Sequence, residues 1–84
     1  MTLKLCDGVF LAEIEYGIAM LDENSGQYWN LNPTAALILQ TLLDVGTPAH
    51  AAEELSKQYE VDIDSASQDV QELIAELRSA GLVK

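Results

Sequence analysis

The first third of the chain has the hydrophobic period of β-strands. In residues 9–16 every second position is apolar or aromatic (Phe10, Ala12, Ile14, Tyr16), with Leu11, Glu13 and Glu15 between them. This alternation predicts a half-buried strand. Residues 18–22 and 27–31 are the second and third predicted strands. The segment 23–26, Glu-Asn-Ser-Gly, is a hairpin turn signal, because Asn and Gly tolerate positive φ. Short connections predict an antiparallel meander, and residues 3–6 fit either a short extra strand or a lead-in.

The pattern changes to a helical period at Asn32. Its side-chain oxygen can cap the free N–H groups of a first turn, and Pro33 suits the first helical position. We expect a helix over residues 33–45, ended by Gly46. Its apolar stripe contains Leu37, Ile38, Leu42 and Val45, widened by Leu39 and Leu43. A helix that is apolar over so much of its circumference should be the central one.

Two further helices follow. Thr47 and Pro48 repeat the cap-then-proline signal and predict a helix over Pro48–Tyr59, with Ala52, Leu55 and Tyr59 facing inward. Asp64 is expected to cap a third helix over residues 65–80, which Gly81 ends. Leu82 and Val83 would then pack back as a tail.

The third helix has an uneven border. Its apolar stripe is formed by Ala66, Val70, Leu73, Ile74 and Leu77, and the flank nearest Leu73 carries Asp69, Glu72 and Glu76. Acids alone border that side. Taken alone, this pattern is typical of a solvated helix face, and it gains meaning only if the acidic border lies beside an open strand.

The order of the elements predicts one α+β domain over residues 1–84. It comprises a three-stranded antiparallel sheet followed by three helices, similar to a winged helix-turn-helix with its wing first. The net charge of −10, from 14 acidic and 4 basic residues, argues against binding nucleic acid, whose phosphates require a basic face. It favours a basic partner or simply solubility.

The sequence also indicates the cellular location of the protein. The longest apolar run is too short to span a bilayer, and the first residues lack the apolar segment of a signal peptide. The lone Cys6 cannot form an internal disulfide, which agrees with a reducing compartment. We therefore expect a cytoplasmic protein with no membrane partner.

Catalytic and metal-binding chemistry is poorly represented. The chain has one His, His50, and one Cys, Cys6, far apart in sequence and without a nucleophile motif around either. A metal site needs about three or four ligands. The segment from Asp22 onward partly mimics a calcium loop, but Pro33 stands where the loop needs its last Glu. We expect no enzyme activity, no metal and no cofactor.

Small, acidic acyl carrier proteins are an alternative. Asp64-Ser65-Ala66, at a predicted helix start, resembles the Asp-Ser-Leu site to which those proteins attach pantetheine. In carriers this serine lies near mid-chain with further helices after it, whereas here one helix follows. The β-rich first half also has no place in a four-helix carrier. A pantetheine arm on Ser65 remains the alternative function.

Several segments in order resemble the PqqD-like family, the peptide-recognition elements of ribosomally made and modified peptides. They are residues 19–22 (Ala-Met-Leu-Asp), residues 26–38 (Gly-Gln-Tyr-Trp-Asn-Leu-Asn-Pro-Thr-Ala-Ala-Leu-Ile), Asp69-Val70 with Leu73 and Leu77, and Gly81-Leu82. No single motif is specific, but the ordered set covers roughly residues 9–83. The form of the second segment is most similar to the stand-alone leader-binding proteins of lasso-peptide pathways.

The resemblance implies a non-catalytic adaptor. The leader of a precursor peptide would add as a fourth strand beside Gln27–Leu31, with its side chains in the groove between that strand and the third helix. Strand addition gives affinity through main-chain bonds and specificity through side-chain pockets. The peptide-binding residues it implies are Gln27, Tyr28, Trp29, Asn30, Asp69, Val70, Leu73, Glu76 and Leu77.

The resemblance also implies protein partners. In lasso systems a separate transglutaminase-like cysteine protease, the leader peptidase, removes the leader, and the precursor then passes to a cyclase.

Each implied site residue could instead have a purely structural role. Trp29, Val70, Leu73 and Leu77 fit a hydrophobic core, and Tyr28 fits the outer face of a strand.

Overall fold

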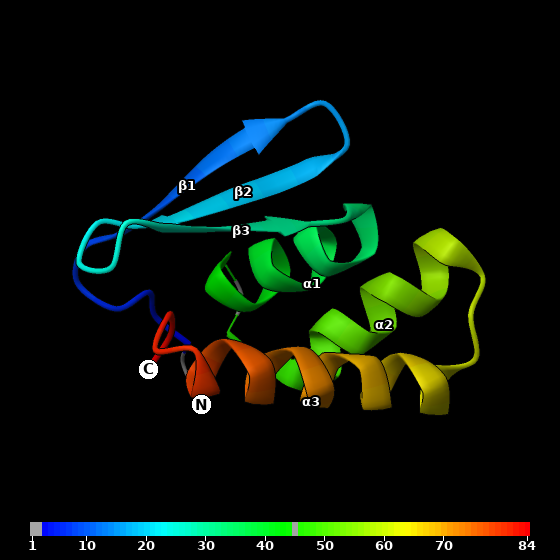
Figure 1. Cartoon of the computed structure of the whole chain (residues 1–84). Helices are drawn as coiled ribbons and strands as arrows, with labels where there is room; N and C mark the ends of the chain where they lie inside the picture. Colours follow the sequence, from blue (N-terminus) through cyan, green and yellow to red (C-terminus); the bar gives the residue numbers. More distant parts are fainter. Residues whose placement is uncertain (1–2, 45) are drawn as a thin grey trace.

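The chain forms a three-stranded sheet followed by three helices, the α+β order that the sequence predicts (Figure 1). The structure is a computed structural model and describes residues 3–44 and 46–84. Its elements are β1 (Val9–Ile14), β2 (Gly17–Asp22), β3 (Gln27–Leu31), α1 (Pro33–Asp44), α2 (Pro48–Tyr59) and α3 (Ile63–Ser79).

The sheet is the predicted antiparallel meander, with strand order β1-β2-β3. Its register aligns Leu11 with Met20 and Met20 with Trp29 across the three strands. Side chains on one strand alternate between the two faces of a sheet. Met20 is fully buried, so this row faces the helices. The next row, Phe10, Leu21 and Tyr28, therefore lies on the opposite face.

The register decides which face of β1 is buried, a question that alternation in the sequence leaves open. Val9 is buried and Leu11 packs against the core, whereas Phe10 is 54% exposed and Ile14 is 45% exposed. The more apolar side of β1 thus faces away from the helices. Glu13, on the inner side, accepts a hydrogen bond from Gln40 of α1 (Nε2 to Oε1, 3.3 Å).

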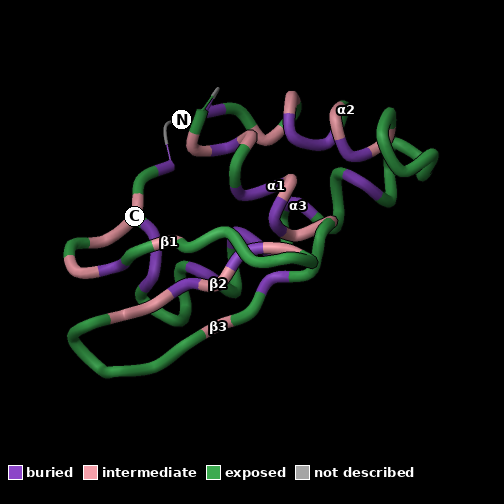
Figure 2. Tube along the Cα trace, turned by 90° about the horizontal axis from the view of Figure 1, so that it is seen from above, coloured by how far each residue is buried: buried purple, intermediate pink, exposed green. Residues whose placement is uncertain are grey.

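The core lies between the inner sheet face and the three helices (Figure 2). Leu39 and Leu42 of α1 are fully buried, and α1 contacts both the sheet and α2, which confirms it as the central helix. The predicted stripe of α3 is buried throughout: Ala66, Val70, Leu73, Ile74 and Leu77. Within the described residues, no helix is long and apolar enough to cross a membrane.

The two ends of the described chain close the core together. Leu5 forms an isolated antiparallel bridge with Val83. The N–H of Cys6 also donates to the Leu82 carbonyl at 2.9 Å. Residues 3–6 are therefore a lead-in that pairs with the C-terminal tail and not with the sheet. Leu82 and Val83 are buried, as the sequence predicts.

Three predicted details need correction. The N-cap of α3 is Asp62 and not Asp64: its carboxylate accepts from Ser65 N at 3.3 Å and its carbonyl from Ala66 N at 2.8 Å, so the helix begins at Ile63. Tyr59 is 43% exposed because α2 ends there and the chain turns away at Glu60, whose φ is 52°. The α1 helix ends at Asp44, and the predicted continuation to Val45 lies outside the described residues.

The junction between β3 and α1 is held by local bonds. Asn32 Oδ1 accepts from Ala35 N and from the Thr34 hydroxyl, both at 2.9 Å, which confirms the predicted cap. Thr47 caps α2 in the same way, through His50 N at 3.3 Å. On the strand side of the junction, Gly17 lies against the Leu31 backbone. A Cβ at Gly17 would stand 1.9 Å from the Leu31 carbonyl oxygen.

We predict that Gly17→Ala destabilises the domain more than Gly26→Ala does. Both glycines have positive φ, 147° and 73°, but a Cβ at Gly26 would meet nothing within 4 Å. Unfavourable backbone conformations cost about 1–3 kcal/mol, and only Gly17→Ala must also move β3. Urea unfolding of both variants measures the difference. Equal free energies of unfolding would show that the Gly17–Leu31 contact does not constrain the fold.

Candidate functional site

The outer side of β3 is an open edge of the sheet. Among the described residues, the strand order places β3 at one end, paired through β2 alone, and α1 follows directly after Asn32. An unpaired edge presents main-chain N–H and C=O groups that can pair with another strand. The candidate site is built around this edge, and the first question is which residues turn those groups outward.

Two hydrogen bonds give the answer. Glu23 N donates to Gly8 O at 2.9 Å, which extends the β1–β2 pairing, so odd-numbered residues of β2 direct their main-chain groups toward β1. Gly26 N donates to Asp22 O at 2.8 Å, so even-numbered residues direct theirs toward β3. In antiparallel pairs both groups of a residue point to the same side and alternate along the strand.

The register then assigns each residue of β3. Gln27, Trp29 and Leu31 oppose even-numbered residues of β2, so their N–H and C=O groups point into the sheet. The main-chain groups of Tyr28 and Asn30 point to the open edge. Their side chains lie on the outer face, where Tyr28 is 70% exposed. Trp29 lies on the helix side, half-buried against the core.

A hollow of about 180 Å³ begins where β3 ends. It is formed between the start of α1 and the middle of α3. Its lining residues are Asn32, Thr34, Ala35, Ile38, Asp69, Glu72, Leu73 and Glu76. Leu73 and Ile38 give it an apolar floor, and both are buried.

The rim of this hollow is acidic. Asp69, Glu72 and Glu76 are exposed on α3 at the borders of the buried stripe. Glu72 accepts a hydrogen bond from Gln68 at 3.1 Å. No lysine or arginine is among the residues that line the hollow. The hollow can therefore take an apolar group and favours a cation at its border.

The structure brings most of the sequence-predicted site residues to two adjoining features. Gln27, Tyr28, Trp29 and Asn30 form the edge strand, while Asp69, Leu73 and Glu76 line the hollow. Val70 is fully buried and Leu77 is 3% exposed, and neither lines the hollow. These two residues pack beneath the site and do not form its surface.

Other lining residues were not among those that the sequence singled out for binding. Asn32, Thr34, Ala35 and Ile38 come from the first turns of α1. The cap at Asn32 was readable in the sequence, and helical periodicity places residues 34, 35 and 38 on one side of α1. That this side meets the acidic border of α3 depends on how the helices pack.

The polar groups considered for other chemistry have local roles. Across the described residues, no group of three or more His, Cys, Asp or Glu could hold a metal ion. The Asp22 carboxylate accepts from Asn24 N and from the Ser25 hydroxyl, at 3.0 and 2.9 Å, so it stabilises the hairpin turn. Ser65 lies in the first turn of α3, in a fold whose sheet distinguishes it from a four-helix carrier.

Comparison with solved structures gives two close matches. The chain is 39% identical to a protein described as lasso peptide synthetase B1 complexed with the leader peptide, with a TM-score of 0.93 and coverage of 100% of this chain and 99% of the other. A structure described as TbiB1 in complex with the TbiA(beta) leader peptide is 22% identical, with a TM-score of 0.87, covering 96% and 94%. The second likeness shows the fold alone. No curated protein matches the chain.

Comparison with family models gives one match that spans most of the chain. The model described as coenzyme PQQ synthesis protein D (PqqD) matches residues 17–83. This span begins at β2 and includes the open strand, the three helices and the C-terminal tail. With the fold and the resemblance of the sequence motifs, it establishes that the chain belongs to the PqqD family.

Proposed function

We propose that the protein is a non-catalytic adaptor that binds the leader segment of a ribosomally made precursor peptide. The leader adds to β3 as a fourth strand, and the adaptor presents it to the enzymes that modify or cleave it. The observation that carries the proposal is the open edge of β3 beside an apolar hollow. The similarity to a solved leader-peptide complex at 39% identity supports it.

The main-chain groups of Tyr28 and Asn30 are the anchors of this binding. A peptide strand can exchange N–H···O=C bonds with both residues, and each such bond contributes about 0.5–1.5 kcal/mol net. These bonds hold any extended sequence, so they supply affinity without selecting a residue type. The side chains on the two faces of the added strand therefore determine which peptide sequences bind.

Side chains of the added strand alternate between two environments. Those on the inner face lie beside Trp29 and reach toward the hollow with its floor of Leu73 and Ile38. Those on the outer face extend the row of Phe10, Leu21 and Tyr28. Both environments are apolar, so the peptide that fits carries apolar residues at alternate positions, with a basic residue favoured at the acidic rim.

The partners that follow in such a pathway are part of the proposal. The leader peptidase, a transglutaminase-like cysteine protease, receives the bound leader, and a cyclase acts on the precursor after cleavage. The adaptor contributes no catalytic group and works in the cytoplasm with its precursor. Isothermal titration calorimetry with the leader segment of a candidate precursor peptide tests the central step. Lack of binding at high concentration of both components would contradict it.

We predict that proline at Tyr28 and proline at Trp29 have different effects. Proline removes a main-chain donor and fixes φ. Trp29→Pro loses an N–H that points to β2, so it should unfold or strongly destabilise the domain. Tyr28→Pro loses an outward N–H, so the domain should fold and lose leader affinity. Circular dichroism and calorimetry measure the two effects.

Tyr28→Ala is the matched control for the loss of the side chain, because alanine keeps the N–H. It should bind the leader more tightly than Tyr28→Pro does. A folded Tyr28→Pro protein that binds like Tyr28→Ala would show that the peptide makes no main-chain bond at Tyr28.

We predict a modest salt dependence for a leader that contains lysine. Exposed ion pairs contribute about 0–1 kcal/mol each, so the apolar and main-chain terms should dominate. Affinity should fall by less than about tenfold between about 0.05 M and about 0.5 M salt. Glu76→Gln should reduce this dependence, and a leader with its lysine replaced by glutamine should show little. Abolition of binding at the higher salt concentration would show that the ion pairs contribute more than the apolar and main-chain terms.

A further inference from the structure

The outer face of the sheet carries no charged residue, although 14 acidic and 4 basic residues occur in the chain. The register of the strands places eight residues on this face, the side away from the helices. They are Phe10, Ala12, Ile14, Gly17, Ala19, Leu21, Tyr28 and Asn30. Antiparallel sheets that face water on one side commonly place polar residues there. The outer face is therefore not an ordinary solvated surface.

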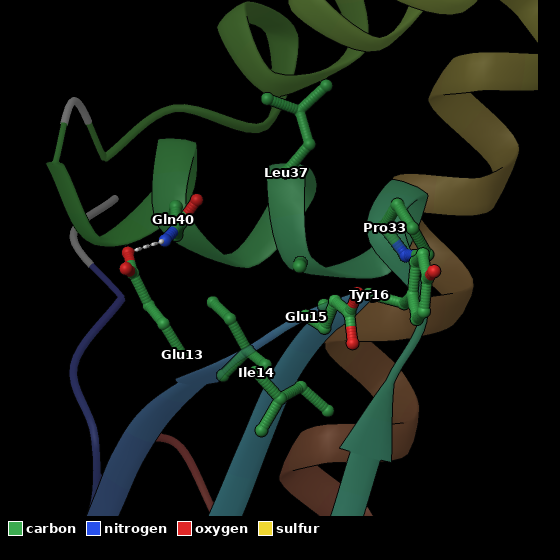
Figure 3. Close-up of a pocket in the computed structure, with 10 residues that line it drawn as sticks. Glu13, Ile14, Glu15, Tyr16, Pro33, Leu37 and Gln40 are labelled. Atoms are coloured by element: carbon green, nitrogen blue, oxygen red, sulfur yellow. Dashed lines mark hydrogen bonds between the residues drawn. The ribbon is translucent and has the colours of Figure 1, made fainter.

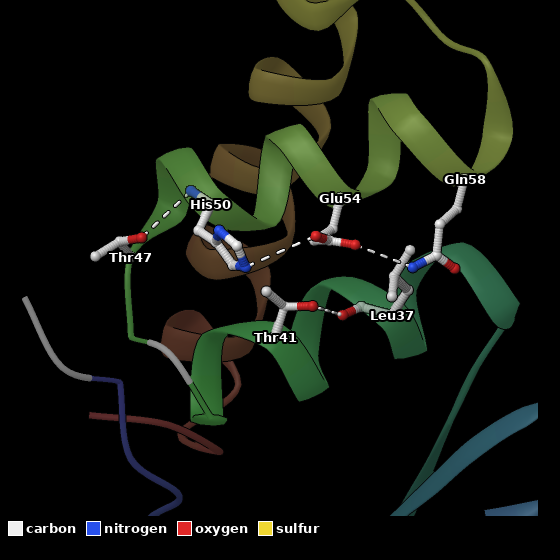
Figure 4. A network of polar contacts seen from close by, with 6 residues as sticks. All are labelled: Leu37, Thr41, Thr47, His50, Glu54 and Gln58. Carbon is white, nitrogen blue, oxygen red and sulfur yellow. Dashed lines mark hydrogen bonds and ion pairs between the residues drawn. The ribbon is translucent and has the colours of Figure 1, made fainter.

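Polar contacts are found on the helix side of the sheet instead. Glu13 of β1 is directed toward α1, where it accepts the hydrogen bond from Gln40 (Figure 3). On α2, Glu54 accepts a hydrogen bond from Gln58 at 3.1 Å and lies 3.8 Å from His50 Nε2 (Figure 4). None of the eight outer-face residues has a side-chain hydrogen bond or ion pair with another described residue. Their side chains are thus free to contact a ligand.

Two rows of the outer face end at the open edge of β3, and they differ in chemistry. The first row consists of Phe10, Leu21 and Tyr28, and the second consists of Ala12, Ala19 and Asn30. Tyr28 and Leu21 form a non-hydrogen-bonded pair, the arrangement in which side chains across two strands lie closer together. The first row therefore presents a large aromatic surface at the edge. The second presents an exposed amide with only methyl groups behind it.

The size of the outer face argues for a peptide strand and against a second folded protein. Three strands of six, six and five residues cover about 300 Å² at ordinary strand spacing. A stable protein interface covers about 800 Å² on each partner. A strand added to β3 needs no such area, because it places its own side chains beside the two rows. The peptide residues opposite Tyr28 and Asn30 then share their face of the sheet.

We propose that the side chains of Tyr28 and Asn30 select the leader on the outer face. An antiparallel leader strand places a large aromatic or β-branched residue opposite Tyr28, because such cross-strand pairs stabilise antiparallel sheets. Two residues nearer its N-terminus, the leader places serine, threonine or asparagine opposite Asn30, whose amide can donate and accept. A larger apolar residue would have little to pack against there. This inference rests on the proposed function and defines the class of peptide that the edge of β3 takes.

Double-mutant cycles test this selection. Calorimetry measures the binding of an alanine scan of the leader segment of a candidate precursor peptide to wild type, Tyr28→Ala and Asn30→Ala. Both substituted side chains are exposed, so the variants should fold, which circular dichroism checks. Tyr28→Ala should weaken binding about two- to fivefold, and replacing one aromatic or β-branched leader residue by alanine should then have little further effect. Asn30→Ala should couple in this way to the leader residue two positions nearer the N-terminus.

Two further variants serve as controls. Tyr28→Phe keeps the ring, so it should bind the leader segment within about twofold of wild type. Phe10→Ala removes an aromatic side chain from the same row, but two strands away from the open edge. Phe10 is 54% exposed, so this variant should fold, and it should couple to no leader residue. Coupling to Phe10 would show that the peptide lies across the outer face instead of pairing with the edge.

Other outcomes also overturn the inference. If wild type binds the leader segment but neither Tyr28 nor Asn30 couples to any of its residues, the outer face does not select, although the proposed function stands. Coupling of Tyr28 to a charged leader residue contradicts the proposed class of peptide. Coupled leader residues that are adjacent, or spaced by two in the opposite direction, contradict the antiparallel pairing. Failure of wild type to bind the leader segment contradicts the proposed function itself.

Discussion

The pairing of β3 with β2 is the constraint on which the site depends. It directs the main-chain groups of Trp29 into the sheet and leaves those of Tyr28 and Asn30 at the edge. At one end of the strand the turn bond from Gly26 N to Asp22 O closes the pairing, and at the other end Gly17, which has no side chain, lets the Leu31 carbonyl approach closely. A slip of one residue would exchange the two faces and bury the wrong side chains.

The junction after β3 turns this edge into a site with a shape. Asn32 ends the strand and caps α1, so the helix starts where the edge finishes. The first turns of α1 then meet α3 at Leu73 and form the hollow with its acidic rim. Three different elements, β3, α1 and α3, together supply main-chain pairing, apolar burial and a weak preference for cations.

Local signals made much of this fold predictable. Asn32-Pro33 and Thr47-Pro48 each start a helix as expected, and the stripe of α3 from Ala66 to Leu77 is buried as its period predicts. The start of α3 was misassigned because Asp62 and Asp64 can both cap, and the choice depends on which carbonyl Ala66 reaches. The direction of the β3 amides depends on the strand register and on the length of the turn. The hollow depends on how α1 packs against α3. Neither feature can be predicted from a short segment of the sequence.

Amide hydrogen exchange, followed by NMR with and without saturating leader peptide, tests strand addition most directly. In the free protein the amides of Trp29 and Leu31 should already be protected by β2, and those of Tyr28 and Asn30 should exchange quickly. Leader binding should slow exchange at Tyr28 and Asn30 and change Trp29 and Leu31 little. If the leader binds while Tyr28 and Asn30 exchange as they do in the free protein, the peptide does not pair with the edge of β3.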